Sequence, residues 1–328
     1  MSALRAGLLG VGMMGRHHAR VLREVPGVEL VAIADPGGDP HGVAGDLPVL
    51  PDVAALIAAG IDMAVVAVPT RFHEEAALAL AEAGVHTLVE KPIADTVEAG
   101  TRMAEAFASR GLVGAVGHVE RFNPALLEAR RRIHEGELGA VYQIATRRQG
   151  PFPARIADVG VGKDLASHDI DLTAWVADSP YELVSGQVAL KSGRPHEDMI
   201  LATGRLANGI IVNHVVNWLS PMKERLTIIT GEKGTFIADT STGDLTFHAN
   251  GTFPLQWESV TAFRGVSEGD MIRYAIPKRE PLRVEHEAFR DAILGEPNEV
   301  VTMEQGLRTL AVVEAVLESA ASGRSIAL

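Results

Sequence analysis

The chain of 328 residues contains no cysteine and carries a clear excess of acidic over basic side chains. The absence of cysteine excludes disulfides, thiolate metal ligands and cysteine nucleophiles, and we expect no metal site. A formal net charge of −12 argues against a general nucleic-acid-binding protein, because such proteins need a basic face that neutralises phosphates. A local cluster such as Arg147-Arg148 can nevertheless bind an anionic small molecule.

Long hydrophobic runs are also absent, since no apolar stretch approaches the roughly 20 residues needed to cross a bilayer. Met1 leads directly into a strand-like run, without the features of a secretory signal peptide. We therefore expect no membrane partner and a cytoplasmic location. Aromatic residues make up only 5% of the chain, whereas apolar residues reach 47%. This composition is typical of a packed α/β protein, and the length indicates two domains.

Strands alternate with helices through the first 120 residues. The predicted strands are 4–9, 28–34, 62–68, 85–89 and 112–117, and the predicted helices are 16–25, 72–83 and 96–109. Such alternation with short loops indicates a doubly wound parallel sheet of the Rossmann type. We assign residues 1–120 to a cofactor-binding domain.

The pattern changes in residues 121–328, which we assign to a second, α/β domain for substrate binding and oligomerisation. Helices are expected at 124–135 and around His168, followed by strands at 181–190, 198–206, 209–217, 226–230, 235–240 and 244–248. Glycine-containing turns separate the last three strands and predict an antiparallel meander with one open face. Helices at 283–294 and 303–321 end the chain and are candidates to pack back on the first domain.

A glycine-rich turn follows the first predicted strand and opens a helix. Within it, the first glycine allows a tight turn, the second allows close approach of a pyrophosphate and the third allows close helix packing. The free N–H groups of the helix then point at the phosphates. The predicted cofactor-binding residues of this turn are Gly10, Gly12, Met13, Met14 and Gly15.

Asp35 ends the second predicted strand, where its carboxylate can accept hydrogen bonds from the adenosine ribose. A 2′-phosphate would meet like charge there, so the sequence favours NAD over NADP. The alternative is a surface aspartate that starts a turn. Further cofactor candidates follow later strands of the sheet: Pro69, Thr70, His73, Glu90 and Lys91.

Lys91, Asp164 and His168 are the candidates for chemistry. Lys91 follows a strand at the sheet edge where such folds bind ligands, and it can donate to a substrate oxygen. Asp164 and His168 are four residues apart and share a helix face. Histidine is suited to removing a hydroxyl proton near neutral pH, and a carboxylate one turn away can orient it. The alternatives are an exposed Lys91–Glu90 pair and an ordinary ion pair on a helix surface.

The order of these motifs resembles the Gfo/Idh/MocA oxidoreductase family over essentially the whole chain. The resemblance rests on the glycine turn, on Glu90-Lys91-Pro92, and on Asp164 and His168 ahead of Asp169-Ile170-Asp171. It implies a Rossmann domain, a second domain with a large open antiparallel sheet, and a homodimer or homotetramer. By resemblance Lys91, Asp164 and His168 form the catalytic group.

A narrower resemblance, to UDP-N-acetylglucosamine 3-dehydrogenases, rests on residues 117–124, Arg147-Arg148-x-Gly150 and residues 158–160. Lys163 departs from that pattern, because relatives usually carry an apolar residue before the aspartate. Guanidinium groups match phosphate oxygens, although a solvated basic surface is the alternative reading. The substrate-binding candidates are Arg121, Asn123, Arg147, Arg148 and Arg155.

Together these features predict an enzyme, an NAD-dependent dehydrogenase that oxidises carbon 3 of a nucleotide-linked sugar such as UDP-N-acetylglucosamine. One alternative is a dehydrogenase of a free polyol or sugar, of the inositol type, and another is a ketosugar reductase. A third alternative is a non-catalytic sensor that binds NAD without turnover. Convergence of the arginines on one pocket would favour the nucleotide-linked sugar.

Overall fold

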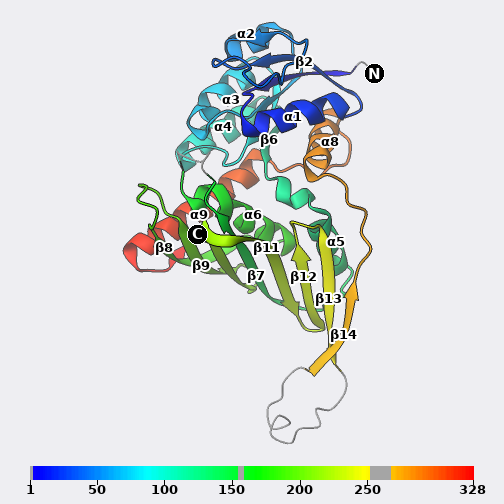
Figure 1. Cartoon of the computed structure of the whole chain (residues 1–328), viewed down its shortest axis with the longest axis vertical. Helices are drawn as coiled ribbons and strands as arrows, with labels where there is room; N and C mark the ends of the chain where they lie inside the picture. The colour runs from blue at the N-terminus through cyan, green and yellow to red at the C-terminus, as the bar shows by residue number, and fades with distance from the viewer. Residues whose placement is uncertain (1–2, 154–158, 252–266) are drawn as a thin grey trace, which may run out of the picture. The chain divides into compact units, whose positions relative to one another are not determined.

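The computed structural model describes residues 3–153, 159–251 and 267–328 of the chain (Figure 1). It separates into two compact units. The first unit comprises Met1–Val119 and Glu280–Ala311, and the second comprises Glu120–Arg279 and Val312–Leu328. In the described residues, no helix is long and apolar enough to span a membrane.

The first unit contains a parallel sheet of six strands in the order β3-β2-β1-β4-β5-β6. This order matches the expected Rossmann topology, in which the strand order reverses beside β1. Its strands are β1 (Leu4–Leu9), β2 (Val28–Ala34), β3 (Val49–Leu50), β4 (Met63–Val66), β5 (His86–Glu90) and β6 (Gly114–Gly117). Its helical segments are α1 (Met13–Glu24), α2 (Val53–Ala58), the short 3₁₀ turn η1 (Thr70–Phe72), α3 (His73–Glu82), α4 (Val97–Ser109), α8 (Pro281–Leu294) and the first part of α9 (Met303–Ser322).

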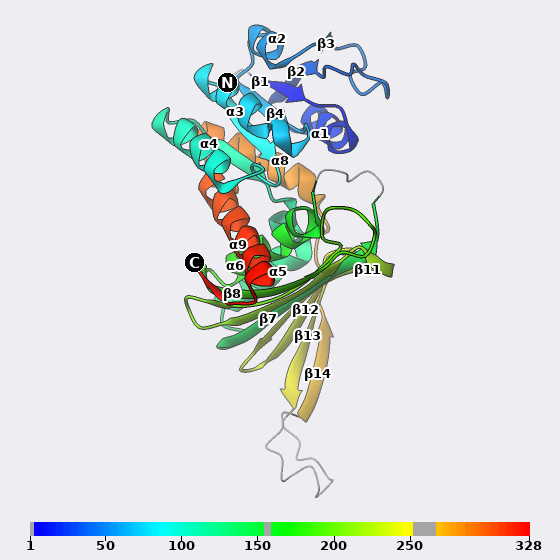
Figure 2. The same cartoon turned by 90° about the vertical axis from the view of Figure 1, so that its left-hand side faces the viewer.

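Helices cover both faces of this sheet (Figure 2). On one face, Leu56 of α2, Leu80 of α3 and Met103 of α4 pack against strand residues such as Val66. On the other face, Leu22 of α1 and Phe289 of α8 pack against the strands. Because both faces are buried, the strands read as nearly continuous apolar runs, which is why the sequence predicts most of them.

The second unit contains a sheet of nine described strands in the order β14-β13-β12-β11-β7-β10-β9-β8-β15. The strands are β7 (Val141–Pro151), β8 (Tyr181–Ala189), β9 (Met199–Leu206), β10 (Ile211–Asn217), β11 (Leu219–Gly231), β12 (Gly234–Asp239), β13 (Asp244–Gly251), β14 (Ser267–Arg273) and β15 (Ile326–Ala327). Among them, β7 and β10 pair in parallel, and the other neighbours pair antiparallel. The sheet is therefore mixed. The predicted antiparallel pairing is correct for β8 to β10 and for β11 to β13, but the sequence did not predict β7, which lies between β10 and β11 and pairs with β10 in parallel.

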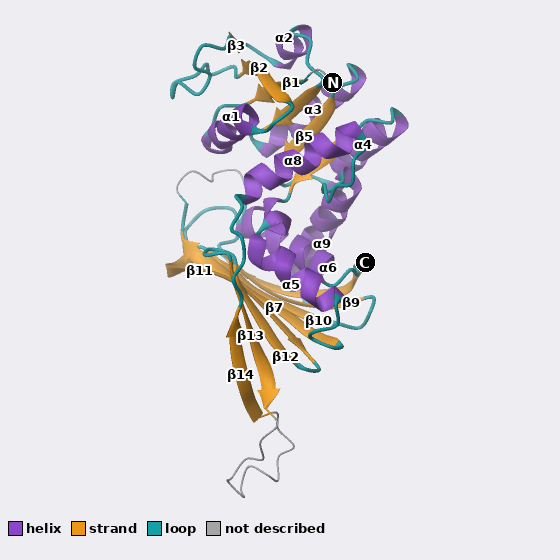
Figure 3. Ribbon diagram, turned by 90° about the vertical axis from the view of Figure 1, so that its right-hand side faces the viewer, coloured by secondary structure: helices purple, strands orange, loops and turns teal. Residues whose placement is uncertain are grey.

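Helices cover one face of this sheet (Figure 3). They are α5 (Pro124–His134), α6 (Ser167–Val176) and the last part of α9, and they bury residues such as Leu126, Trp175 and Val313 against the strands. Two short helical turns complete the unit: the 3₁₀ turn η2 (Val119–Phe122), which starts at the unit boundary, and the π-helical turn η3 (Gly162–Ala166).

Candidate functional site

The glycine turn of the first unit lies between β1 and α1, as the sequence predicts. Gly10 has a φ of 96°, and a Cβ there would lie 2.7 Å from the Ala67 carbonyl oxygen. A Cβ on Gly15 would lie 2.0 Å from the Gly10 carbonyl oxygen, so a side chain would push α1 off the turn. A Cβ on Gly12, in contrast, meets no atom of the described residues within 4 Å. The three glycines thus do what a dinucleotide-binding turn requires.

The start of α1 offers free backbone donors. No described side chain caps the helix at Gly12, and Met13 and Gly12 are exposed. The first N–H groups of a helix have no partner within the helix and carry its partial positive charge. Met13 and Met14 therefore lie where a helix can present N–H groups to an anion, and their contact with a pyrophosphate stays a prediction.

The Asp35 carboxylate fastens this turn to the end of β2. Its Oδ2 accepts a hydrogen bond from Val11 N (2.9 Å), and its Oδ1 accepts one from Gly37 N (2.8 Å). A carboxylate has about four lone-pair sites, so each oxygen keeps capacity for one more donor. Asp35 can therefore hold the turn and accept from a ribose hydroxyl at the same time, and the residues present fit a bound NAD.

The residues after β4 and β5 lie at the same carboxyl edge of the sheet. Pro69 is exposed, and Thr70 is buried at the start of η1. His73 is also buried, with Nε2 2.9 Å from the Val68 carbonyl oxygen and Nδ1 3.0 Å from the Pro92 carbonyl oxygen. Burial lowers the pKa of His73 despite these carbonyls. His73 thus links the two loops that carry cofactor candidates, and its own contact with cofactor stays a prediction.

Glu90 ends β5 with its side chain buried and Lys91 half-buried beside it. The Glu90 carboxylate accepts from Lys91 N (3.0 Å) and bonds His18 Nε2 (2.8 Å). Burial opposes ionisation of Glu90, but the His18 hydrogen bond and the nearby Lys91 charge hold its carboxyl pKa below the usual value. Sequence reasoning missed His18, which faces Glu90 from α1.

In the second unit, Asp164 and His168 lie on consecutive helical segments. Asp164 belongs to the π-helical turn η3, and His168 is the second residue of α6. The Asp164 side chain is buried, and Asp164 N donates to the Gly160 carbonyl (3.1 Å). Single π-helical turns are rare and often occur at functional sites. Lys163 Nζ lies 3.5 Å from Glu314 Oε1 of α9, so the ammonium group pairs with the Glu314 carboxylate.

The two aspartates that follow His168 hold α6 in place through buried contacts. Asp169 accepts from Thr146 Oγ1 (3.0 Å) and Arg148 Nε (2.7 Å), both on β7. Asp171 accepts from Arg121 Nε (2.7 Å) and Nη2 (2.6 Å) in a bidentate pair. The carboxylates of Asp169 and Asp171 therefore fasten the helix that carries His168.

The arginines predicted to meet a substrate pair with carboxylates in the described part of the second unit. Arg121 pairs with Asp171, and Arg148 bonds Asp169 and also Glu120 (2.8 Å). Burial alone would lower the pKa of Arg148, but the charges of Asp169 and Glu120 outweigh it and raise that pKa. The Arg147 side chain is half-exposed, and its Nη2 lies 3.4 Å from Glu224 Oε2. These guanidinium groups donate N–H groups to carboxylates of the protein, so their contact with a substrate stays a prediction.

Asn123 and Arg155 complete the predicted substrate set. Asn123 caps α5: its Oδ1 accepts from Ala125 N (3.1 Å), and its Nδ2 donates to the Thr240 carbonyl (2.9 Å). Asn followed by proline at the first helical position is a helix-start signal, and it accounts for the Asn123-Pro124 pair. Arg155 and Asp158 lie outside the described residues.

Comparison with known proteins agrees with this architecture. Residues 4–118 match the family model described as "Oxidoreductase family, NAD-binding Rossmann fold", and residues 130–328 match "Oxidoreductase family, C-terminal alpha/beta domain". A scyllo-inositol 2-dehydrogenase (NAD(+)) from Bacillus subtilis (strain 168) is 33% identical over 193 residues, which is 56% of this chain and 56% of that protein.

A UDP-N-acetylglucosamine 3-dehydrogenase from Acidithiobacillus ferrooxidans is 33% identical over 218 residues, which is 65% of this chain and 66% of that protein. The matched stretches thus span less than two thirds of these two curated relatives. A solved structure of a UDP-N-acetylglucosamine 3-dehydrogenase from the same species superimposes with a TM-score of 0.84 at 26% identity, over 98% of this chain and 99% of that chain.

A dehydrogenase from Bordetella pertussis, solved in complex with NADH and UDP-GlcNAcA, has a TM-score of 0.80 at 25% identity, over 99% of each chain. The two family models together cover most of the sequence. The chain therefore belongs to the Gfo/Idh/MocA oxidoreductase family, with an NAD-binding Rossmann domain followed by the family's C-terminal α/β domain.

Proposed function

We propose that the protein is an NAD-dependent dehydrogenase of a sugar or polyol hydroxyl. The observation that carries this proposal is the glycine turn, in which Gly12 stays open while Asp35 keeps acceptor capacity beside it. Bound NAD supplies the acceptor for the hydride that leaves the carbinol carbon. The Gly12 backbone, the start of α1 and the Asp35 carboxylate bind and orient the dinucleotide.

The catalytic group of this proposal is Lys91, Asp164 and His168. His168 accepts the hydroxyl proton, because a neutral imidazole is a suitable base near neutral pH. Asp164 orients the proton relay from one helical turn earlier, and Lys91 donates a hydrogen bond to the reacting oxygen. The electrons of the broken C–H bond leave as hydride, and the proton leaves through His168, so the alcohol becomes a ketone.

For the substrate we propose a nucleotide-linked sugar, UDP-N-acetylglucosamine, oxidised at carbon 3. The similarity to UDP-N-acetylglucosamine 3-dehydrogenases in sequence and fold supports this choice. The similarity to inositol dehydrogenases favours a free polyol as the second candidate. Arg121, Arg147 and Arg148 each pair with a carboxylate, so their binding of a diphosphate is untested, which is the reason for testing both substrates.

The test follows NAD reduction at 340 nm with UDP-N-acetylglucosamine and with myo-inositol, for the wild type, His168→Gln and Lys163→Gln. We expect His168→Gln to lower kcat by about 100-fold or more, since it removes the base. Lys163→Gln is the matched control, because Lys163 pairs with Glu314, and its kcat should stay within about threefold.

Each outcome of this assay decides between the candidates. Turnover of the UDP-sugar supports the nucleotide-linked substrate, whereas turnover of inositol alone discards it and keeps the mechanism. If both substrates give no turnover although NAD binds, the oxidation of these two sugars is contradicted, and the reductive direction or an NAD sensor becomes the better hypothesis.

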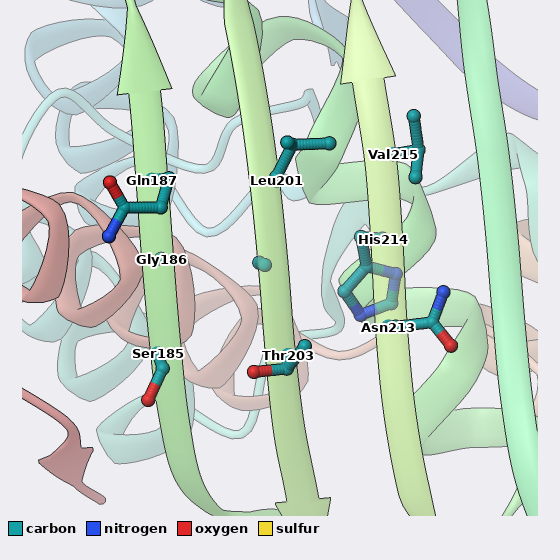
Figure 4. Close-up of a pocket in the computed structure, with 9 residues that line it drawn as sticks. Ser185, Gly186, Gln187, Leu201, Thr203, Asn213, His214 and Val215 are labelled. Atoms are coloured by element: carbon teal, nitrogen blue, oxygen red, sulfur yellow. The ribbon is translucent and has the colours of Figure 1, made fainter.

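We also propose that the protein is a homodimer or homotetramer assembled through the open face of the nine-stranded sheet. A pocket on β8, β9 and β10 marks that face (Figure 4). Gln187, Leu201 and Val215 lie side by side on these strands, and Leu201 is 44% exposed. Exposed apolar side chains on an open sheet face favour a second copy as the partner. Light scattering gives the molar mass of the wild type and of Leu201→Glu, and we expect a smaller assembly for the variant. The same molar mass for both proteins would contradict the proposal.

A further inference from the structure

A row of buried polar side chains in the first unit links the end of β5 to two helices. His18 of α1 lies between Glu90 and His286 of α8: its Nε2 is 2.8 Å from Glu90 Oε1, and its Nδ1 is 2.8 Å from His286 Nε2. His18, Glu90 and His286 are 0%, 7% and 1% exposed. Three buried polar groups this close to one another restrict which nitrogen of each ring can carry a proton.

The protonation of the row follows from burial. Burial lowers the pKa of His286 well below its usual value, so its ring is neutral and carries one N–H. Its Nδ1 is buried and has no hydrogen-bond partner among the described residues. Because a buried N–H without a partner is rarer than an under-satisfied acceptor, the proton belongs on Nε2 and is donated to His18 Nδ1.

The direction of the remaining bonds is then fixed. With its Nδ1 accepting from His286, the His18 ring carries its own proton on Nε2 and donates it to Glu90 Oε1. Glu90 Oε2 accepts from the backbone N–H of Lys91 (3.0 Å). Both oxygens of the carboxylate are therefore held, one by a side chain and one by the residue that carries the predicted catalytic amine.

The neighbouring strand leaves room for this arrangement. A Cβ on Gly117 of β6 would lie 3.4 Å from Glu90 Cδ and Glu90 Oε2. Contacts this close are at the limit of ordinary packing, so a larger side chain at position 117 would press on the carboxylate. The Glu90 side chain is thus confined between β6 and α1.

We propose that His18 and His286 are positioning residues, which fix the Glu90 carboxylate on the Lys91 amide and thereby hold Lys91 in its reactive place. This inference rests on the proposed function only for the role of Lys91. The chain His286–His18–Glu90–Lys91 joins residues of α1, β5 and α8, and each hydrogen bond donates toward the carboxylate. A displacement of about 1 Å in a catalytic group can cost about 100-fold in rate, so a fixed carboxylate matters for catalysis.

Two substitutions of His18 separate the bond to Glu90 from the bond to His286. In His18→Gln the amide nitrogen stands where imidazole Nε2 stood, so the donor to Glu90 remains. In His18→Asn the shorter side chain faces His286 and loses the bond to Glu90. We expect His18→Asn to lower kcat by about 10- to 100-fold with KM for NAD within about twofold, while His18→Gln stays within about threefold. Equal losses in the two variants would overturn the proposal.

A second readout needs no substrate. Hydrogen exchange of the Lys91 amide, followed by NMR, should be slow in the wild type and in His18→Gln and at least about tenfold faster in His18→Asn. Equal exchange in all three proteins would overturn the proposal. Long-range ¹H–¹⁵N spectra of the wild type should place the proton of His286 on Nε2, and a proton on Nδ1 would overturn it too. If neither sugar is turned over, the proposed function fails while these spectra still decide on the hydrogen-bond chain.

Discussion

At the scale of single residues, Asp35 combines a structural and a binding role. Its carboxylate accepts from Val11 N and Gly37 N, so it fixes the glycine turn even before a cofactor binds. Asn supplies one acceptor oxygen and no charge in the same space, so it can satisfy only one of these two amides. We expect Asp35→Asn to weaken NAD binding by at least about tenfold, measured by calorimetry.

Asp62→Asn is the matched control for this measurement. Asp62 precedes β4 at the opposite edge of the sheet, and its carboxylate accepts from Arg5 N (2.8 Å). A substitution there removes the same charge from the same unit but leaves the glycine turn intact. Equal losses of NAD affinity in the two variants would mean that Asp35 acts through general stability rather than through the turn.

At the scale of elements, the turn η3 depends on a carboxylate that is distant in sequence. Glu197 Oε1 accepts from Gly162 N (2.9 Å), and the Glu197 carbonyl accepts from Val161 N (3.0 Å). A Cβ on Gly160 would lie 2.1 Å from the Glu197 carboxylate. Glu197 therefore sets the start of the segment that carries Asp164.

We expect Glu197→Ala to lower kcat by about tenfold or more, because it releases the turn ahead of Asp164 and His168. Glu197→Gln keeps an acceptor for Gly162 N and should stay within about threefold of the wild type. Steady-state kinetics with the sugar that the wild type oxidises checks both values. The same loss in both variants would show that the charge of Glu197, rather than its hydrogen bond, matters.

Local signals in the sequence were sufficient for many of these elements. The Thr302-x-x-Gln305 pattern predicts the start of α9, and the structure has both reciprocal bonds, Thr302 N to Gln305 Oε1 (3.2 Å) and Gln305 N to Thr302 Oγ1 (3.3 Å). The buried strands of the first unit were predicted from apolar runs, because both faces of that sheet are covered. Gly323 follows the end of α9 with a φ of 69°, in the left-handed region that glycine favours after a helix.

Strand β7 and the buried networks had no local signal. The helix-facing side of β7 carries Thr146 and Arg148 among its buried residues, so the apolar alternation that marks a strand is missing. Their partner Asp169, and the partners of Arg121 and His18, come from distant parts of the chain. Only the folded sheet shows that Arg148 meets a buried carboxylate, which explains why the sequence suggested a phosphate instead.

At the scale of the whole molecule, buried histidines make stability depend on pH in both units. Burial lowers the pKa of His73 and His286 in the first unit and lowers that of His214 to about 4 in the second. Each ring therefore binds its proton less readily when folded than when unfolded, so unfolding takes up protons below the usual pKa of 6.5. Their burial therefore has no effect on the pH dependence of stability above pH 6.5, and it lowers the free energy of unfolding as the pH falls below that value. Carboxyls with a lowered pKa, such as those of Glu90 and Glu120, add to the free energy of unfolding while they are ionised in the folded protein. This stabilisation is lost only below about pH 4.5.

His214 allows this acid sensitivity to be tested in one unit. It lies between Thr146 Oγ1 (2.7 Å) and the Tyr181 hydroxyl (2.9 Å), and the charge of Asp169 only partly offsets the effect of burial on its pKa. One proton bound on unfolding costs about 1.4 kcal/mol per pH unit, which gives about 2 kcal/mol between pH 6.5 and 5. We expect His214→Gln to reduce the loss of stability over that range by this amount, measured by denaturant unfolding at several pH values.

Tyr181→Phe separates the proton from the hydrogen bond in this experiment. It removes one partner of His214 without removing the imidazole, so it should lower stability at every pH and leave the slope between pH 6.5 and 5 unchanged. If His214→Gln instead shifts stability equally at all pH values, His214 takes up no proton on unfolding in this range. In that case the acid sensitivity of the second unit over this range must come from groups other than His214.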